Sequence, residues 1–179
     1  MSKIGRMPIA LAGAKVQVDG QRILIEGPKA KFEHVLPSEI GIAVDATHVK
    51  LSISKDTREN RMMWGLHRAL LSNKIVGVDR GFQQKMIING LGYKAILAGN
   101  KITFSLGYTH KIELDLPQGV TLEVDKTGQQ LLFKSADRFE LGNVCDKVRS
   151  FRPPEPYKGT GIIKEGEVIF RKAGKTKSS

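Results

Sequence analysis

The feature that most constrains the fold of this chain is an internal repeat. Gly20 corresponds to Gly99 and Leu36-Pro37 to Leu116-Pro117, so turns and strand ends recur at a spacing of about eighty residues. In the first copy, alternating apolar residues flank Asp19-Gly20, which is a strong hairpin signal. Because a repeat of this length is a common domain size, the sequence predicts two similar domains in tandem.

Each copy carries short strand-like segments followed by one helical segment. Runs of antiparallel strands followed by a helix are typical of the α+β class and differ from the alternating pattern of a parallel βαβ sheet. We therefore expect a small, mostly antiparallel sheet packed against one helix in each domain. The expected divisions are residues 1–81 with a basic N-terminal lead-in, residues 82–152, and residues 153–179 as a proline-rich arm and basic tail. Besides the hairpins around Gly20 and Gly99, the expected strands are 32–36, 41–44, 49–53, 85–88, 112–116, 120–124 and 131–133.

Helical periodicity replaces alternation in two places. The first helix is expected to begin at an Asp56 cap, answered by Glu59, and to run to about Lys74. The second is expected to follow a cap at Ser135. The faces predicted to cover the sheets are Met62, Leu66, Ala69 and Leu70 in the first helix, and Leu141, Val144, Cys145 and Val148 in the second. Cys145 is therefore interpreted as a core cysteine, and Arg58, Arg61 and Arg68 as a solvated helix surface.

The charge balance narrows the class of partner. The chain has 29 Lys and Arg against 18 Asp and Glu, a net charge of +11 and a pI near 9.8, which favours polyanions, with nucleic acid ahead of a membrane. Residues 149–179 hold eight basic and three acidic residues, a local excess of 8 − 3 = +5. The single cysteine cannot form an internal disulfide, and we expect an intracellular, soluble chain, since no secretory signal or apolar stretch of spanning length is seen.

The segment after the second helix is rich in proline. Pro153, Pro154 and Pro156 restrict φ and remove backbone donors, so Arg149 to Lys164 is predicted to lie extended as a stiff arm. Tyr157 and Lys158 place an aromatic ring beside a cation, and Gly159 and Gly161 permit close approach of another backbone. These residue types suit a sugar-phosphate surface, although a proline-rich loop with a structural tyrosine is the alternative.

No constellation of residues nominates catalysis or a cofactor. Gly90-Leu91-Gly92-Tyr93-Lys94-Ala95 has glycine spacing like that of a dinucleotide fingerprint, but strand-like alternation follows where a helix is required, so it is interpreted as a turn. The four histidines are scattered, and no nucleophile, general base or metal-ligand cluster stands out. We therefore expect no enzyme activity, no cofactor, no metal and no small-molecule substrate. Binding remains, through Lys94, Arg149, Arg152, Lys158 and Lys164 together with Tyr93 and Tyr157.

Several segments resemble one known family. Pro154-Glu155-Pro156-Tyr157-Lys158-Gly159, followed by Gly161-Ile162, closely resembles the C-terminal signature of the sixth protein of the bacterial-type large ribosomal subunit. The stretches 89–95 and 105–110 and the opening Ser2-Lys3-Ile4-Gly5-Arg6 are similar to further segments of that family, and the duplication agrees with it. The resemblance covers nearly the whole chain.

This resemblance implies a two-domain structural protein of the ribosome, in the cytoplasm or in an organelle of bacterial descent. Family members bind large-subunit ribosomal RNA near the base of the acidic-protein stalk and the factor-binding region, support translation, have neighbouring ribosomal proteins as partners, and have no membrane association. Where the family usually has lysine, this chain has Thr160, so that one phosphate contact is either missing or supplied by Lys164. A free-standing basic adaptor for protein contacts is the alternative function. The residues expected at the RNA are Lys94, Arg149, Arg152, Tyr157, Lys158, Gly159, Gly161, Lys164, Arg171, Lys172, Lys175 and Lys177.

Overall fold

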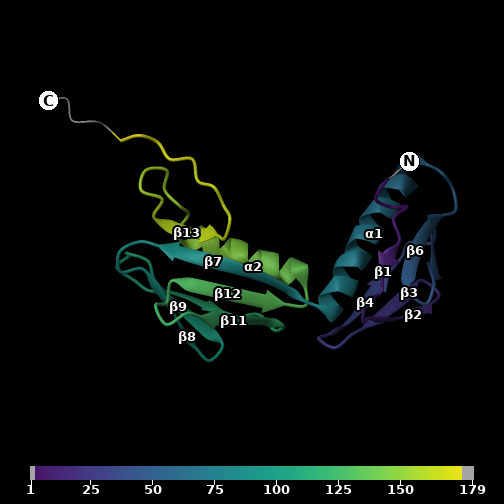
Figure 1. Cartoon of the computed structure of the whole chain (residues 1–179), viewed down its shortest axis with the longest axis horizontal. Helices are drawn as coiled ribbons and strands as arrows, with labels where there is room; N and C mark the ends of the chain where they lie inside the picture. Colours follow the sequence, from purple (N-terminus) through teal and green to yellow (C-terminus); the bar gives the residue numbers. More distant parts are fainter. Residues whose placement is uncertain (1–2, 175–179) are drawn as a thin grey trace. The chain divides into compact units, whose positions relative to one another are not determined.

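The computed structural model describes residues 3–174, which divide into two compact units (Figure 1). Unit 1 contains the described residues up to Phe82 together with Ala136–Arg138, and unit 2 contains Gln83–Ser135 and the described residues from Phe139 onward. The domain limits expected from the sequence stay predictions.

Unit 1 is built from six strands and one long helix. The strands form two antiparallel three-stranded sheets, ordered β1-β6-β5 and β2-β3-β4, and α1 packs against β3, β4 and β6. The elements are β1 (Ile9–Ala10), β2 (Lys15–Asp19), β3 (Arg22–Glu26), β4 (Lys31–Val35), β5 (Ile40–Val44), β6 (His48–Ile53) and α1 (Arg58–Asp79).

Unit 2 repeats this plan and extends it by one strand. Its sheets are ordered β10-β9-β8 and β11-β12-β7-β13, so that β8-β9-β10 matches β2-β3-β4 and β11-β12-β7 matches β5-β6-β1. The predicted α+β class and the two similar domains are thereby confirmed. The elements are β7 (Phe82–Asn89), β8 (Lys94–Ala98), β9 (Lys101–Ser105), β10 (Ile112–Asp115), β11 (Val120–Val124), β12 (Gln130–Ser135), α2 (Arg138–Phe151) and β13 (Gly161–Lys164).

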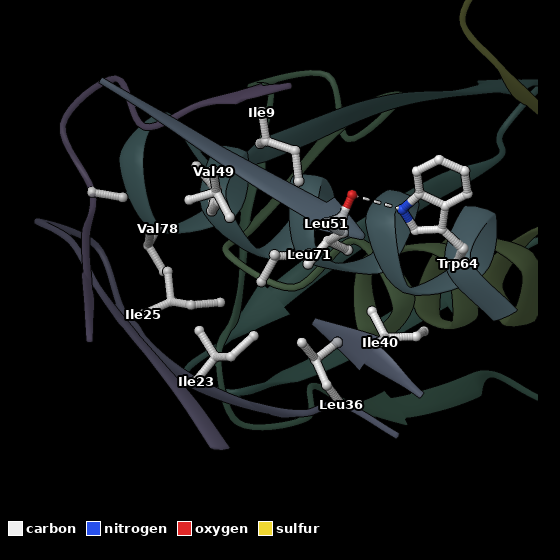
Figure 2. Packing of buried hydrophobic residues seen from close by; sticks show 12 residues of the cluster. Ile9, Ile23, Ile25, Leu36, Ile40, Val49, Leu51, Trp64, Leu71 and Val78 are labelled. Carbon is white, nitrogen blue, oxygen red and sulfur yellow. Dashed lines mark hydrogen bonds between the residues drawn. The ribbon is translucent and has the colours of Figure 1, made fainter. Parts of the chain in front are cut away.

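The core of unit 1 lies between α1 and the strands (Figure 2). Ile23 and Ile25 of β3 are fully buried, as is Leu71 of α1. The Trp64 indole closes one end of this cluster, where its Nε1–H donates a hydrogen bond of 2.9 Å to the Leu51 carbonyl (Figure 2). The bond satisfies the one polar atom of a side chain that is otherwise packed among apolar groups.

The predicted buried face of α1 is wrong. Met62, Leu66 and Leu70 are 60%, 50% and 40% exposed, and the buried residues are Trp64, Leu71, Ile75, Gly77 and Val78. The helix is apolar on both faces, and therefore a helical period fits either of them.

The start and end of α1 also differ from expectation. Thr57 is the N-cap, its side chain accepting from the Asn60 backbone N–H at 3.2 Å, whereas Asp56 binds the Arg61 guanidinium at 2.6 and 2.8 Å. The helix continues to Asp79 instead of ending near Lys74. Arg68, expected to be solvated, donates from its guanidinium to the carbonyls of Met7 and Pro8, each at 3.1 Å.

The packing of α2 agrees with the sequence. Leu141, Val144, Cys145 and Val148 are all buried, and Cys145 is a free thiol in the core as predicted. The helix begins at Arg138, and the expected cap residue Ser135 is the last residue of β12.

The arm is not a continuous extended segment, which corrects the prediction for Arg149 to Lys164. Its first residues complete α2, and its last four form β13, antiparallel to β7 with Gly161 opposite Asn89 and Lys164 opposite Met86. Only the residues between these two elements form a loop, and this loop contains all three prolines of the arm. Ile162 of β13 is fully buried, so the chain beyond the prolines belongs to the fold of unit 2.

Candidate nucleic-acid interface

The residues predicted to bind RNA lie in three groups on unit 2. We call these the loop tip, the ion-paired turn and the ring stack. Gly161 belongs to the base of the loop, and Lys175 and Lys177 lie outside the described residues. The loop tip comprises Tyr157, Lys158, Gly159, Arg171 and Lys172. The ion-paired turn comprises Arg149 and Lys164 with their acidic partners. The ring stack comprises Tyr93, Tyr108, His110 and Arg152, and Lys94 follows Tyr93 in the chain.

The loop tip brings three cations to one exposed tyrosine. Lys172 donates its backbone N–H to the Pro156 carbonyl at 2.8 Å, so the C-terminal segment runs alongside the turn. The Arg171 guanidinium lies over Gly159, only 3.1 Å from where a β-carbon would stand. Tyr157 is 57% exposed, and Lys158, Arg171 and Lys172 are exposed around it.

Glycines allow this loop to pack on itself. At Gly161, φ is +140°, and a β-carbon would lie 2.7 Å from the Pro153 carbonyl oxygen and 2.8 Å from that of Arg152. The Ile162 N–H donates to the Arg152 carbonyl at 2.8 Å, which fastens the start of β13 to the end of α2. Close approach at Gly161 therefore serves the protein's own backbone.

Thr160, which stands where the family usually has lysine, has a role inside the loop. Its hydroxyl donates to the Glu155 carboxylate at 2.8 Å, and the Glu155 N–H donates to the Thr160 carbonyl at 3.0 Å. This reciprocal pair closes the loop across its base. The side chain is half-buried, as is that of Glu155.

The ion-paired turn holds the chain after β13 against α2. Arg149 of α2 binds the Glu167 carboxylate through Nη2 at 2.5 Å and Nε at 3.2 Å, and the Lys164 N–H donates to the same carboxylate at 3.1 Å. These bonds, with that of Arg149 the stronger, lower the pKa of Glu167. The Lys164 ammonium contacts Asp146 at 2.7 Å. Two of the predicted RNA-binding cations are thus already balanced by carboxylates of the same unit.

The ring stack is centred on Arg152. Its guanidinium carbon lies 4.8 Å from the centroid of the Tyr108 ring and 5.9 Å from that of Tyr93, within cation–π range of both. His110 continues the series, because its ring is stacked on Tyr108 at 5.9 Å with 18° between the planes. Arg152 is half-buried, whereas Tyr108 and His110 are exposed.

Neighbouring backbone fixes the two tyrosines. The Tyr93 ring packs so closely on Gly90 and Gly107 that β-carbons there would approach it to 2.3 and 2.8 Å. The Tyr108 hydroxyl donates to the carbonyl of Phe151 at 3.1 Å, and the Phe151 ring meets Phe104 of the core edge-on at 5.5 Å. The stack is thereby tied to the C-terminal end of α2 and to β9.

The sequence prediction missed Tyr108 and His110 as site residues. A signal was available, since both tyrosines of the stack follow the dipeptide Leu-Gly: Leu91-Gly92-Tyr93 and Leu106-Gly107-Tyr108. Gly92 and Gly107 have φ of +74° and +77°, which is the left-handed conformation that glycine adopts without strain. Each tyrosine of the stack therefore follows a glycine in the left-handed conformation.

Other kinds of site do not emerge from the described part of the chain. Within residues 3–174, no three His, Cys, Asp or Glu side chains are placed to hold a metal ion. Neither described helix has the length and apolar character needed to cross a membrane. Burial raises the pKa of the Cys145 thiol to about 11, which makes it a poor nucleophile.

Fold and site together define a class of tandem-duplicated α+β protein whose second unit presents cations and aromatic rings. The family model described as Ribosomal protein L6 matches residues 12–81 and residues 89–165, so its two matched segments follow the duplication. The chain belongs to the ribosomal protein L6 family.

Relatives are similar over their full length. The "Large ribosomal subunit protein uL6" of Xanthobacter autotrophicus is 40% identical over 178 residues, covering 99% of this chain and 100% of the relative. The protein of that name from Azorhizobium caulinodans is 41% identical with the same coverage, and that from Methylacidiphilum infernorum is 41% identical over 98% of each chain. The family expected from the sequence signature is thus confirmed.

Proposed function

We propose that this chain is a structural constituent of the large ribosomal subunit that binds large-subunit ribosomal RNA through unit 2. The observation that carries the proposal is the loop tip, where Lys158, Arg171 and Lys172 surround the exposed Tyr157 on a loop closed by its own hydrogen bonds. Lysine and arginine supply phosphate affinity, and an ordered loop loses little entropy when it binds. The names of the relatives support the assignment to the large subunit.

The proposed RNA contacts extend from the loop tip. Arg152 belongs to the ring stack and Lys94 follows Tyr93 of that stack in the chain, while Gly159 and Gly161 shape the loop. Arg149 and Lys164 contribute only when phosphates replace Glu167 and Asp146 as their partners. Lys175 and Lys177 extend the basic segment beyond the described residues. We place this surface near the stalk base and the factor-binding region of a cytoplasmic ribosome, and we assign the chain no catalytic step.

Lysine substitutions test the proposal. Lys158→Ala is expected to weaken binding to a large-subunit rRNA transcript and to reduce the slope of log affinity against log salt by about 1, since one phosphate contact is lost. Lys126→Ala is the matched control, because Lys126 is an exposed lysine in the turn between β11 and β12 of the same unit. Lys158 is a cleaner probe than Arg152, whose guanidinium also holds two tyrosine rings.

Two results would contradict this function. The wild-type chain would fail to bind the transcript in a salt-dependent manner, or the chain would not sediment with large subunits in cells. If Lys158→Ala left the salt slope unchanged, the loop tip would not be part of the RNA interface.

Neighbouring ribosomal proteins are a second proposed class of partner. The observation that favours them is the outer face of α1, where Met62, Met63, Leu66 and Leu70 are exposed on a helix whose opposite face is already buried. An apolar face of this kind is typical of a protein contact. Leu66→Glu should then release the chain from a complex that survives ribonuclease, and retention of the complex would contradict the contact.

A further inference from the structure

The ring stack has one closed end and one open end. At the closed end, Tyr93 packs on Gly90 and Gly107, which leave no room between ring and backbone. At the open end, His110 is exposed and is stacked on Tyr108. Pairwise contacts link Tyr93 to Arg152, Arg152 to Tyr108, and Tyr108 to His110, which is the last and exposed member.

A purely structural stack would not need its last member. Arg152 already lies within cation–π range of two tyrosine rings, and the Tyr108 hydroxyl already donates to the Phe151 carbonyl. His110 adds a flat, exposed aromatic surface to an array that is rigid beneath it. Proteins that bind single-stranded nucleic acids present flat, exposed aromatic rings on which bases stack, because every base has a π-face that stacks without regard to sequence.

Two members of the stack are followed in the chain by exposed lysines. Lys111 follows His110 and Lys94 follows Tyr93, and both lysines are exposed. A base on the stack would bring its own phosphates, which these ammonium groups can bind. Ring face and flanking charge therefore match the two chemical parts of a nucleotide.

We infer that the ring stack is a platform for one unpaired nucleobase of the bound RNA, with the base stacked on His110. This inference rests on the proposed RNA-binding function and adds to it a contact that reads an unstacked base, besides the phosphate contacts of the loop tip. His110 touches the base directly, Tyr108 supports His110, and Arg152 positions Tyr108. The base is selected for being unpaired and not for its identity.

Three variants of the full chain test this inference, with a large-subunit rRNA transcript as the probe. His110→Ala removes the plate, His110→Trp replaces it by a larger ring, and His48→Ala changes an exposed histidine of unit 1 as a control. The only native tryptophan, Trp64, is buried, so added exposed emission in His110→Trp reports on position 110.

The expected result has two parts. His110→Ala binds the transcript roughly tenfold more weakly than wild type with an unchanged salt slope, since stacking on one aromatic ring is lost but no phosphate contact. His110→Trp binds at least as tightly as wild type, and its added emission is quenched at saturation because a base stacks on the indole. His48→Ala binds like wild type.

The outcomes separate this inference from the proposed function. Absence of salt-dependent binding by wild type refutes the function, and the inference with it. Wild-type binding with equal affinity in His110→Ala, or with unquenched emission in His110→Trp, refutes the platform alone. Emission that shifts to the blue without quenching, only when ribosomal proteins are added, overturns it in favour of a protein partner.

Discussion

We predict that the folding stability of unit 1 falls in acid, because of a pair of histidines. His34 of β4 is only 6% exposed, and its Nε2 lies 3.1 Å from Nδ1 of His67 on α1, so one ring donates to the other. Burial, then the charge of Lys74 and the nearness of His67, lower the pKa of His34 from 6.5 to about 4. Burial also lowers the pKa of His67. The fold therefore favours the neutral form of both imidazoles.

The sign and size of the effect follow from linkage. Between pH 6.5 and 4 the unfolded chain binds a proton at residue 34 that folded unit 1 does not bind, so stability falls as the pH falls through this window. Above pH 6.5 the contribution is constant. One pKa unit is equivalent to about 1.36 kcal/mol. Protonation of His34 in the unfolded chain therefore lowers the unfolding free energy of unit 1 by about 2 kcal/mol between pH 7.5 and pH 5.

Urea unfolding at a series of pH values, followed by tryptophan fluorescence, measures this loss. Trp64 is the only tryptophan and belongs to the core of unit 1, so its emission reports that unit without contribution from unit 2. His34→Leu removes the titrating group, and its unfolding free energy should fall less between pH 7.5 and pH 5 by about 2 kcal/mol. His48→Gln, at an exposed position, should follow wild type. Equal pH dependence in His34→Leu and wild type would refute the reasoning.

Three predictions concern unit 2. Because burial raises the pKa of Cys145 to about 11 from 9, its thiolate fraction at pH 8 falls about a hundredfold, and iodoacetamide should label it far more slowly in native than in urea-denatured protein. Gly161→Ala should destabilise unit 2 by more than about 1 kcal/mol in thermal unfolding, because its φ is +140° and the new β-carbon would meet backbone atoms. Gly142→Ala is the control: Gly142 lies in α2 with open space around it, and the change should stabilise unit 2 by about 0.5–1 kcal/mol. Val144→Asp buries an unpaired charge at a cost of several kcal/mol and should make unit 2 susceptible to protease while Trp64 emission of unit 1 stays native; resistance equal to wild type would contradict it.

In helix α1, the helical period of apolar residues does not determine which face is buried. For α2, one apolar stripe and an otherwise polar surface leave a single choice, and the predicted Leu141 and Val148 are buried. In α1, Met62, Leu66 and Leu70 form an apolar row as regular as the buried one. The burial of Trp64 is set by tertiary partners, the carbonyl of Leu51 among them, which a helical period does not encode.

The arm and the ring stack show the same limit for long-range contacts. Three prolines correctly exclude a helix after Phe151, but local rules say nothing of β13 pairing with β7 across more than seventy residues of chain. Charge and glycine content singled out Tyr157, Lys158 and Gly159, which the structure groups at the loop tip and whose RNA contact stays a prediction. They did not identify Tyr108 or His110, because stacking depends on how two distant turns meet Arg152.

The difference between the two copies explains why the RNA-binding surface proposed here belongs to unit 2. The copies share a sheet plan, but the outer strand β1 has two residues, whereas its counterpart β7 has eight. A two-residue strand cannot hold a further strand, and in unit 1 the carbonyls of Met7 and Pro8 just before it are bound by the Arg68 guanidinium. The long edge of β7 is open to pairing, and β13 takes it, which returns the chain over the end of α2 and orders the loop between them. The longer edge strand β7 thus gives unit 2 a place where β13 pairs and where the loop with Tyr157 and Lys158 is held by its own hydrogen bonds.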